Sequence, residues 1–313
     1  MKIYLAPLQG LTDWIFRESF CQNIGIFDKT FSPFIRVKAG EFYRPSQCKD
    51  ILPANNTFQH PVPQFMGNDV ESFRRFEALC LEQNYKEVNI NMGCPFPLLT
   101  GKKLGAGILA HPKNVAEFLE GAFTNSTLKI SVKCRLGQES SAEFEELIPI
   151  FNAFPLEEII IHPRIGKQQY KGEVDLDAFG KYAPQLKAPV CFNGDILTTA
   201  DVEKAIEIFP TLNAVMIGRG MIRNPFLLEQ IKQQQSSPEE KYAKLRGFHI
   251  SMLERCKTKY VGDLHLLKRL EELWEYHADG FEDGRKIYKK VKKCKTMANY
   301  EAVIFEAIKQ LTI

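Results

Sequence analysis

Several features that often reveal the class of a protein are missing from this sequence of 313 residues. No apolar run approaches the roughly 18 residues that a membrane-spanning helix needs, and the run at residues 3–7 is too short for the core of a signal peptide. No low-complexity tract indicates disorder. Since 44% of the residues are hydrophobic and 25% are charged, we expect a globular, cytoplasmic protein with no membrane partner.

The eight cysteines also lack the grouping of a metal site or a disulfide framework. None belongs to a CxxC pair, and no histidine stands at metal-ligand spacing from one. We therefore expect no bound metal and thiols that stay reduced. Most of these cysteines resemble small core residues, but Cys94 lies between Gly93 and Pro95 at the start of a glycine-rich segment.

Short apolar runs alternate with helical patterns over the first 217 residues. The runs predict eight strands, at residues 3–6, 31–37, 63–66, 87–92, 129–135, 158–162, 189–193 and 214–217. Helical periodicity lies between them, for example at residues 69–84 and 115–123. This alternation favours an α/β fold of the (β/α)8 TIM barrel type, with an active site at the carboxyl ends of the strands. A doubly wound open sheet is the alternative.

From residue 238 onward the pattern changes to helices alone. We expect helices at residues 239–258, 263–276, 282–296 and 300–310. The chain is therefore divided into a barrel at residues 1–238 and a small all-helical domain at residues 239–313.

The helical region is also the basic part of the chain. Residues 241–313 carry 16 Lys and Arg against 10 Asp and Glu, a surplus of 6, whereas the remainder has a deficit of 3. A dense basic run contributes Arg285, Lys286, Lys289, Lys290, Lys292 and Lys293. Such a run indicates contact with a nucleic acid backbone or is merely a solvated helix face.

One connection, at residues 38–62, is unusually long and shows no clear periodicity. Loops of this length are uncommon unless they have a function. We favour an inserted hairpin over the barrel mouth, and a direct substrate contact is the alternative.

Polar residues and glycines follow the last two predicted barrel strands. Asn193, Gly194 and Asp195 follow one, and Gly218 and Arg219 follow the next. Glycines allow a ligand to approach the backbone, and an arginine suits a phosphate. The sequence predicts a phosphate site here, although tight βα turns would have the same composition.

Two further residues carry potential chemistry. Lys133 lies in an otherwise apolar strand, where a buried cation needs an electron-rich partner unless its side chain reaches solvent. Cys94 would be mostly protonated near neutral pH, because an ordinary thiol has a pKa of about 8.5, and could act as a general acid. The alternative for Cys94 is an inert structural thiol.

Taken together, the strand-end segments resemble the tRNA-dihydrouridine synthase family. The matching stretches occur in the family's order, and they are APLQGLTDWIFR at residues 6–17, QFMG at 64–67, EVNINMGCP at 87–95, SVKCRLG at 131–137, IIIHPR at 159–164, PVCFNGDI at 189–196 and AVMIGRGMIRNP at 214–225. The size of the helical region looks most like the bacterial subfamily that modifies position 16.

The resemblance implies FMN in the barrel mouth, NADPH or NADH as reductant, and tRNA as substrate. It implies that the cofactor is bound by Pro7, Leu8, Gln9, Gln64, Asn91, Lys133, His162, Asn193, Gly194, Asp195, Gly218 and Arg219. It also implies hydride transfer from flavin N5 to C6 of uracil, with Cys94 as the catalytic proton donor to C5. Asn91, Arg164 and the basic run would contact the RNA, and a monomer is expected.

Some residues depart from the family pattern, and other functions stay open. Leu8 replaces a usual Met, Gln9 a usual Glu, and Pro163 a small residue, which puts the exact flavin contacts in doubt. One alternative is an FMN enzyme that acts on a free pyrimidine, as dihydroorotate dehydrogenase does. Others are a flavin-free barrel acting on sugar phosphates and a non-catalytic RNA-binding barrel.

Overall fold

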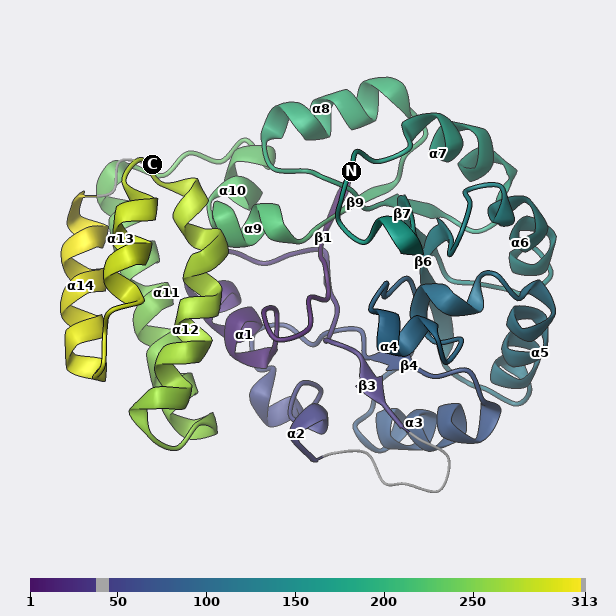
Figure 1. Cartoon of the computed structure of the whole chain (residues 1–313), viewed down its shortest axis with the longest axis horizontal. Coiled ribbons are helices and arrows are strands. Elements are labelled where there is room, and N and C mark those ends of the chain that lie inside the picture. Colours follow the sequence, from purple (N-terminus) through teal and green to yellow (C-terminus); the bar gives the residue numbers. More distant parts are fainter. Residues whose placement is uncertain (38–44, 311–313) are drawn as a thin grey trace.

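A ring of parallel strands, surrounded by helices, makes up the first 217 residues of the protein (Figure 1). The structure is a computed structural model that describes residues 1–37 and 45–310. Within them the strands are β1 (Lys2–Leu5), β2 (Lys29–Thr30), β3 (Ile35–Arg36), β4 (Gln64–Met66), β5 (Glu87–Met92), β6 (Lys129–Gly137), β7 (Ile159–Ile165), β8 (Val190–Phe192) and β9 (Ala214–Ile217). All paired strands are parallel.

The ring closes through a second barrel strand that is broken into β2 and β3. β2 pairs with β1, and β3 pairs with β4. Between them Phe31 bridges to Val62, whose backbone N–H donates to the Thr30 carbonyl (2.8 Å) and whose carbonyl accepts from Ser32 (3.0 Å). The sequence predicts one uninterrupted strand here, which is wrong because Pro33 offers no N–H to the ladder. The predicted eight-stranded barrel is confirmed.

Helices connect the strands, and most of them cover the outside of the ring (Figure 1). They are α1 (Trp14–Asn23), α2 (Pro45–Cys48), α3 (Val70–Glu82), α4 (Pro97–Thr100), α5 (Pro112–Phe123), α6 (Glu143–Phe151), α7 (Leu176–Tyr182), α8 (Thr199–Ile208), α9 (Arg219–Arg223) and α10 (Leu227–Ile231). Short 3-10 turns are η1 (Pro53–Asn55), η2 (Gly105–Ile108), η3 (Gly166–Gln168) and η4 (Ala183–Gln185). Several helices begin after a capping residue; Asp69, for example, accepts from the Ser72 N–H at the start of α3.

The long connection after β3 differs from the hairpin that the sequence favoured. Its residues 45–61 form α2 and η1 and contain no strand. Arg17 of α1 holds this segment, because its Nη2 donates to the Asp50 carbonyl (2.5 Å) and to Asn56 Oδ1 (2.9 Å). Residues 38–44, the rest of the connection, lie outside the described part of the chain.

The apolar core lies mainly between the strands and the helices, while the interior of the barrel contains both apolar and polar side chains. Outward-facing strand residues such as Leu5, Phe65 and Ile90 pack under the helices. Inside the ring, Tyr4 and Met216 belong to a separate small apolar cluster. The alternation of side chains along each strand produces both layers.

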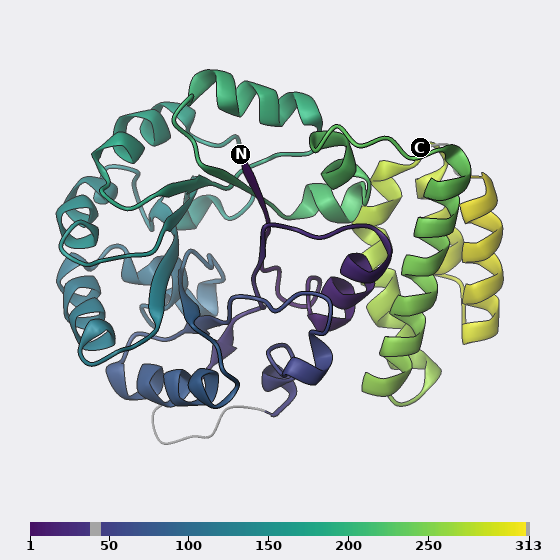
Figure 2. The same cartoon turned by 180° about the vertical axis from the view of Figure 1, so that it is seen from behind.

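The four helices expected in the C-terminal region are confirmed, except that the third ends at Val291 and not at residue 296. They are α11 (Pro238–Lys259), α12 (Asp263–His277), α13 (Gly284–Val291) and α14 (Met297–Gln310), with η5 (Ala278–Gly280) after α12. They pack together on one side of the barrel, beside α1, α9 and α10, as the two opposite views show (Figures 1 and 2). None of the helices in residues 1–37 and 45–310 has the length and apolar character that crossing a membrane requires.

Two buried histidines lie where these helices meet the barrel. The Nδ1–H of His277 donates to the Ile222 carbonyl of α9 (2.7 Å), and the ring of His249 stacks on Trp274 with centroids 5.5 Å apart. Burial lowers the pKa of His277 to about 4, against the opposing effect of the bond to Ile222. Burial, followed by the nearby His277, also lowers the pKa of His249 well below its ordinary value.

Acidification from pH 7 to 5 is therefore expected to destabilise the fold through His277. The unfolded chain binds this proton near pH 6.5, whereas the folded chain binds it only near pH 4, so about 2 kcal/mol of stability is lost by pH 5. In urea denaturation, His277→Gln should lose less stability over this range, because glutamine can donate to Ile222 but does not titrate. His265→Gln, exposed on the same helix, should follow the wild type; an unchanged pH dependence in His277→Gln would contradict this explanation.

Candidate active site

A pocket opens at the carboxyl ends of the barrel strands. The empty space within it and in its open mouth amounts to about 900 Å³. Eleven of the twelve residues expected to bind a cofactor line it, and these are Pro7, Leu8, Gln9, Asn91, Lys133, His162, Asn193, Gly194, Asp195, Gly218 and Arg219. Cys94 lines it as well. The strand ends therefore bring these segments together, and the roles of the individual residues stay predictions.

Gln64 is the expected cofactor residue that does not line the pocket. Its side chain is completely buried, and its Nε2 donates to Asn89 Oδ1 (2.8 Å). Its Oε1 accepts from Asn91 Nδ2 (2.8 Å). Gln64 therefore fixes the orientation of the Asn91 amide, and through Asn91 it can act on the pocket.

Asn91 in turn fixes the backbone that carries the thiol. Its Oδ1 accepts from the backbone N–H groups of Gly93 and Cys94, at 3.0 Å each. Behind the thiol, the Cys94 carbonyl accepts from Ala106 (3.0 Å). Gly105 packs against the same carbonyl with a φ of +57°, and a Cβ added there would lie 2.5 Å from that oxygen. The thiol is thus held from both sides at the edge of the pocket.

The environment of Cys94 favours the protonated thiol. Burial raises the pKa of the thiol above its ordinary value. A hydrogen bond from the Phe96 backbone and the positive charges of Arg135 and Lys133 act in the opposite direction but do not outweigh burial. A protonated sulfur facing a pocket can donate a proton, so the geometry agrees with a general acid.

Next to the thiol the pocket carries an excess of positive charge. Burial, and then the charge of Arg135, lower the pKa of Lys133 to about 8. Burial also lowers the pKa of Arg135 to about 10 and that of His162 well below its ordinary value. Within the described residues Lys133 makes no hydrogen bond or ion pair. A half-buried cation without a partner predicts an electron-rich ligand at this position.

The carboxylate of Asp195 joins two arginines on the other side of the pocket. It accepts from Arg164 Nη1 (3.0 Å) and from Arg219 Nη2 (2.9 Å), and it also pairs with Arg164 Nη2. Arg164 is only 2% exposed and its Nη1 lies 2.9 Å from His162 Nε2. Arg164, which the sequence suggested as an RNA contact, therefore has almost no surface to offer an RNA in this arrangement.

Several residues that line the pocket are missing from the site that the sequence predicts, among them the aromatic residues Tyr170 and Phe34. Tyr170 is half exposed, and the guanidinium groups of Arg135 and Arg219 lie 5.5 Å and 5.0 Å from its ring centroid. Phe34 reaches the pocket from the broken second strand. Tyr170 follows η3 in a segment without periodicity, so no sequence signal marks it; Arg135, two residues after Lys133 on the same strand, could have been found from the period of a strand.

The C-terminal helices hold the loop that forms one wall of the pocket. This loop is braced by Thr12, whose Oγ1 accepts from the Leu8 N–H (2.7 Å) and donates to the Ala6 carbonyl (2.9 Å). Arg269 of α12 donates through Nη2 to the Leu11 carbonyl (2.8 Å) and to Asp13 Oδ1 (3.2 Å).

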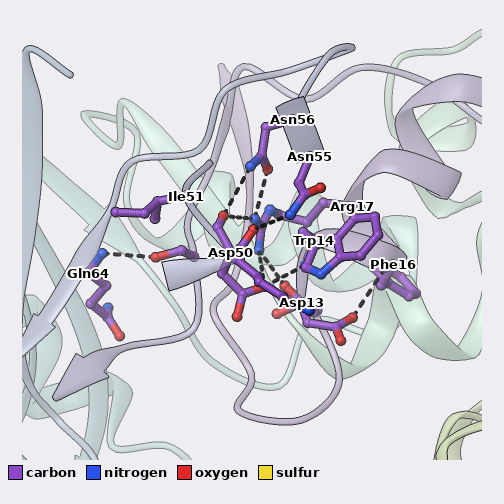
Figure 3. Close-up of polar contacts among 12 residues, drawn as sticks. Asp13, Trp14, Phe16, Arg17, Asp50, Ile51, Asn55, Asn56 and Gln64 are labelled. Atoms are coloured by element: carbon purple, nitrogen blue, oxygen red, sulfur yellow. Dashed lines mark hydrogen bonds and ion pairs between the residues drawn. The ribbon is translucent and has the colours of Figure 1, made fainter. Parts of the chain in front are cut away.

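Asp13 is the centre of a buried polar network. Its Oδ2 accepts from Lys259 Nζ (2.8 Å), and burial alone would raise its pKa, but Arg269 and Lys259 outweigh burial and lower it. Beside it, Asp50 accepts from the Trp14 N–H (2.6 Å) (Figure 3). Burial raises the pKa of Asp50 to about 6. The network connects the pocket loop, the segment after β3 and the C-terminal helices.

The basic run lies away from the pocket, on and directly after α13, and its six side chains are exposed. Three of them have acidic partners, since Arg285 pairs with Asp279, Lys286 with Asp283 (2.8 Å) and Lys292 with Glu271 (3.9 Å). No ion pair to a described residue is found for Lys289, Lys290 and Lys293. These three lysines are the ones available to a phosphate backbone.

Comparison with known proteins gives one family over nearly the whole chain. A family model described as dihydrouridine synthase matches residues 4–312. The chain is 31% identical over 248 residues to the probable tRNA-dihydrouridine synthase 2 of Bacillus subtilis (75% of this chain, 73% of that protein). It is 26% identical over 293 residues to tRNA-dihydrouridine synthase B of Pasteurella multocida (92% and 82%) and 25% identical over 306 residues to the tRNA-dihydrouridine(16) synthase of Escherichia coli (93% and 94%).

Solved structures support the barrel fold. The old yellow enzyme homologue of Zymomonas mobilis superposes with a TM-score of 0.55 at 13% identity, covering 76% of this chain and 94% of that one. Morphinone reductase gives a TM-score of 0.52 at 12% identity, with coverage of 76% and 88%. At such low identity these likenesses concern the fold alone.

Alkylation of Cys94 by iodoacetamide, followed by mass spectrometry of its peptide, should reach half of its maximal rate at a pH above that of free cysteine. Arg135→Gln should move this pH higher still, because the Arg135 guanidinium lowers the pKa of the thiol and, with its own pKa at about 10, stays charged at a pH where Lys133 is already neutral. Lys187→Gln, which removes an exposed lysine that does not line the pocket, should leave it unchanged. A shift to lower pH in Arg135→Gln would show that the guanidinium does not act on the thiol.

Proposed function

The chain belongs to the dihydrouridine synthase family, and on that premise we propose that it reduces uridine in transfer RNA to 5,6-dihydrouridine. The observation that carries this proposal is the protonated thiol of Cys94, which faces the same pocket as the unpartnered cation of Lys133. The family favours tRNA over a free pyrimidine, and it favours NADPH or NADH as the source of electrons.

The pocket residues fit FMN. The unpartnered Lys133 cation and the neutral His162 would meet the electron-rich edge of the flavin ring, with Pro7, Leu8 and Gln9 along the ring. The turns after β8 and β9 would hold the ribityl chain and phosphate through Asn193, Gly194, Asp195, Gly218 and Arg219. When bound there, FMN supplies the hydride that reduces the base.

The side chains of this protein then orient the base and supply the proton. Asn91 lies on the strand that leads to Cys94 and is held by Gln64, so it can orient the uracil ring. The Cys94 thiol donates its proton to C5 of uracil and recovers one from solvent. Arg164 is buried against Asp195 and His162, so we assign it a positioning role.

The RNA must present a single nucleotide to this recessed pocket. Extruding the target base costs a few kcal/mol, which contacts to the rest of the tRNA offset. We propose that the helical domain at residues 239–313 provides these contacts, with Lys289, Lys290 and Lys293 on the phosphate backbone.

Replacement of the proton donor gives the most direct test. With unmodified tRNA and NADPH, the wild type should form dihydrouridine, measured by mass spectrometry of digested tRNA. Cys94→Ala should bind FMN and tRNA but turn over about 100-fold to 10,000-fold more slowly, as expected for a lost general acid. Cys294→Ala, outside the pocket, should remain active; near-normal turnover of Cys94→Ala would remove the proposed acid.

Charge reversal tests the RNA-binding role of the helical domain. The triple variant Lys289→Glu, Lys290→Glu and Lys293→Glu should bind tRNA more weakly, and the slope of log affinity against log salt should fall in magnitude by about 2 to 3. The control reverses three other exposed lysines, Lys113, Lys187 and Lys204, with the same change in net charge. Equal affinity and equal salt dependence in both variants would refute this role.

A further inference from the structure

The segment after Cys94 carries two large apolar side chains exposed to solvent. Phe96 is 55% exposed and Leu98 is 72% exposed, and they flank the first residue of α4. The intervening turn is anchored from below, because the buried Leu99 packs with Met66 and Leu104. Because the packing of Leu99 already fixes the turn, the exposed side chains of Phe96 and Leu98 contribute little to folding. Both remain available for contact with a ligand.

These two side chains are held on a rigid support. The Phe96 carbonyl accepts from the backbone N–H groups of Leu99 (2.8 Å) and Thr100 (3.0 Å). Gly107 packs directly under Thr100, where an added Cβ would lie 2.3 Å from the Thr100 carbonyl oxygen. A ligand that contacts this turn therefore does not have to order a mobile loop, which is a cost that weakens many interactions.

The same turn presents positive charge. Lys102 and Lys103 are exposed, and neither forms an ion pair with a described residue. Their backbone carbonyls accept from Asn68 Nδ2 at 3.2 Å and 3.3 Å, so the backbone of the lysines is also fixed. Apolar surface for stacking beside cations for phosphates is the combination that binds single-stranded nucleic acid.

The turn also adjoins the thiol of Cys94. The Phe96 backbone N–H makes a hydrogen bond to the Cys94 sulfur, and Pro95 between them lines the pocket. In Figure 1, α4 lies in front of the strands, over the centre of the barrel. Any nucleotide chain that places one base at Cys94 must pass close to this turn.

We propose that Phe96 and Leu98 pack against the nucleobase next to the target uridine, and that Lys102 and Lys103 bind the adjoining phosphates. This inference rests on the proposed function and names a specific contact for it. When the uridine enters the pocket, its neighbour loses a stacking partner, and an apolar side chain at the edge of the pocket replaces that partner. The turn would thereby stabilise the extruded state of the substrate.

The test compares tRNA turnover with the reaction that needs no tRNA. The double variant Phe96→Ala and Leu98→Ala should lower kcat/KM for dihydrouridine formation about 5-fold to 100-fold, the effect of losing one base stack. Its NADPH oxidation with oxygen as acceptor should equal that of the wild type. Phe58→Ala, which removes another exposed aromatic ring, should leave both rates unchanged, and Phe96→Trp should keep tRNA turnover.

Two further measurements separate stacking from charge and from damage to Cys94. The apolar double variant should retain the wild-type salt dependence of KM for tRNA, whereas Lys102→Gln with Lys103→Gln should reduce its slope by about 1 to 2. The alkylation pH profile of Cys94 should not change in the apolar variant; a shifted profile would assign the effect to the thiol and overturn the proposal.

The outcomes also distinguish this inference from the function on which it rests. A wild type that forms no dihydrouridine would end the proposed function itself. An active wild type together with an apolar double variant of equal kcat/KM would overturn only the stacking contact, and would leave the exposed patch to a protein partner.

Discussion

The buried carboxylate of Asp13 joins the N-terminal and C-terminal parts of the chain. Its partners Lys259 and Arg269 lie 246 and 256 residues further along the sequence. It begins α1, directly after the loop that forms one wall of the pocket, and it accepts hydrogen bonds from Lys259 and Arg269 of the C-terminal helices. Removing one partner of such a buried pair costs about 3–5 kcal/mol, because the other charge is left without compensation. The helical region therefore takes part in shaping the pocket, in addition to any contact that it makes with RNA.

The charges inside the pocket follow a different logic. Asp13 is fully compensated within the protein, as is Asp195 between two arginines, whereas Lys133 is not. Burial weakens the charged state of Lys133 and favours the neutral thiol of Cys94. Lys133 has no partner among the described residues, and the Cys94 thiol keeps a proton that it can donate, so both groups are poised to interact with molecules that enter the pocket. The paired charges of Asp13 and Asp195 thus stabilise the structure around the pocket, and the unpaired charge of Lys133 is available to a ligand in the pocket.

Much of this arrangement could be predicted from local sequence patterns. The short apolar runs located the barrel, and the residues at the ends of the last two strands located Asn193, Gly194, Asp195, Gly218 and Arg219, because parallel strands bring their carboxyl ends to one edge. Pro7, Leu8, Gln9, Asn91 and His162 came from the resemblance to a family. The break at Pro33 escaped prediction, since the apolar run continues across it.

Other features depend on tertiary contacts that leave no local pattern. The burial of Gln64 and Arg164 could not be predicted from the sequence. The side chain of a polar residue at a strand end can line the pocket or lie in the layer beneath it, and the sequence does not distinguish the two. Tyr170 was missed because its contacts are with Arg135 of β6 and Arg219 of α9, which lie far from it in the sequence. The close packing of Gly105 against Cys94 has a consequence for evolution: position 105 is closed to every other side chain by the neighbouring atoms while the thiol keeps its place. Position 262 has open space around it and is restricted to glycine by its backbone alone, with φ +84° and ψ +146°.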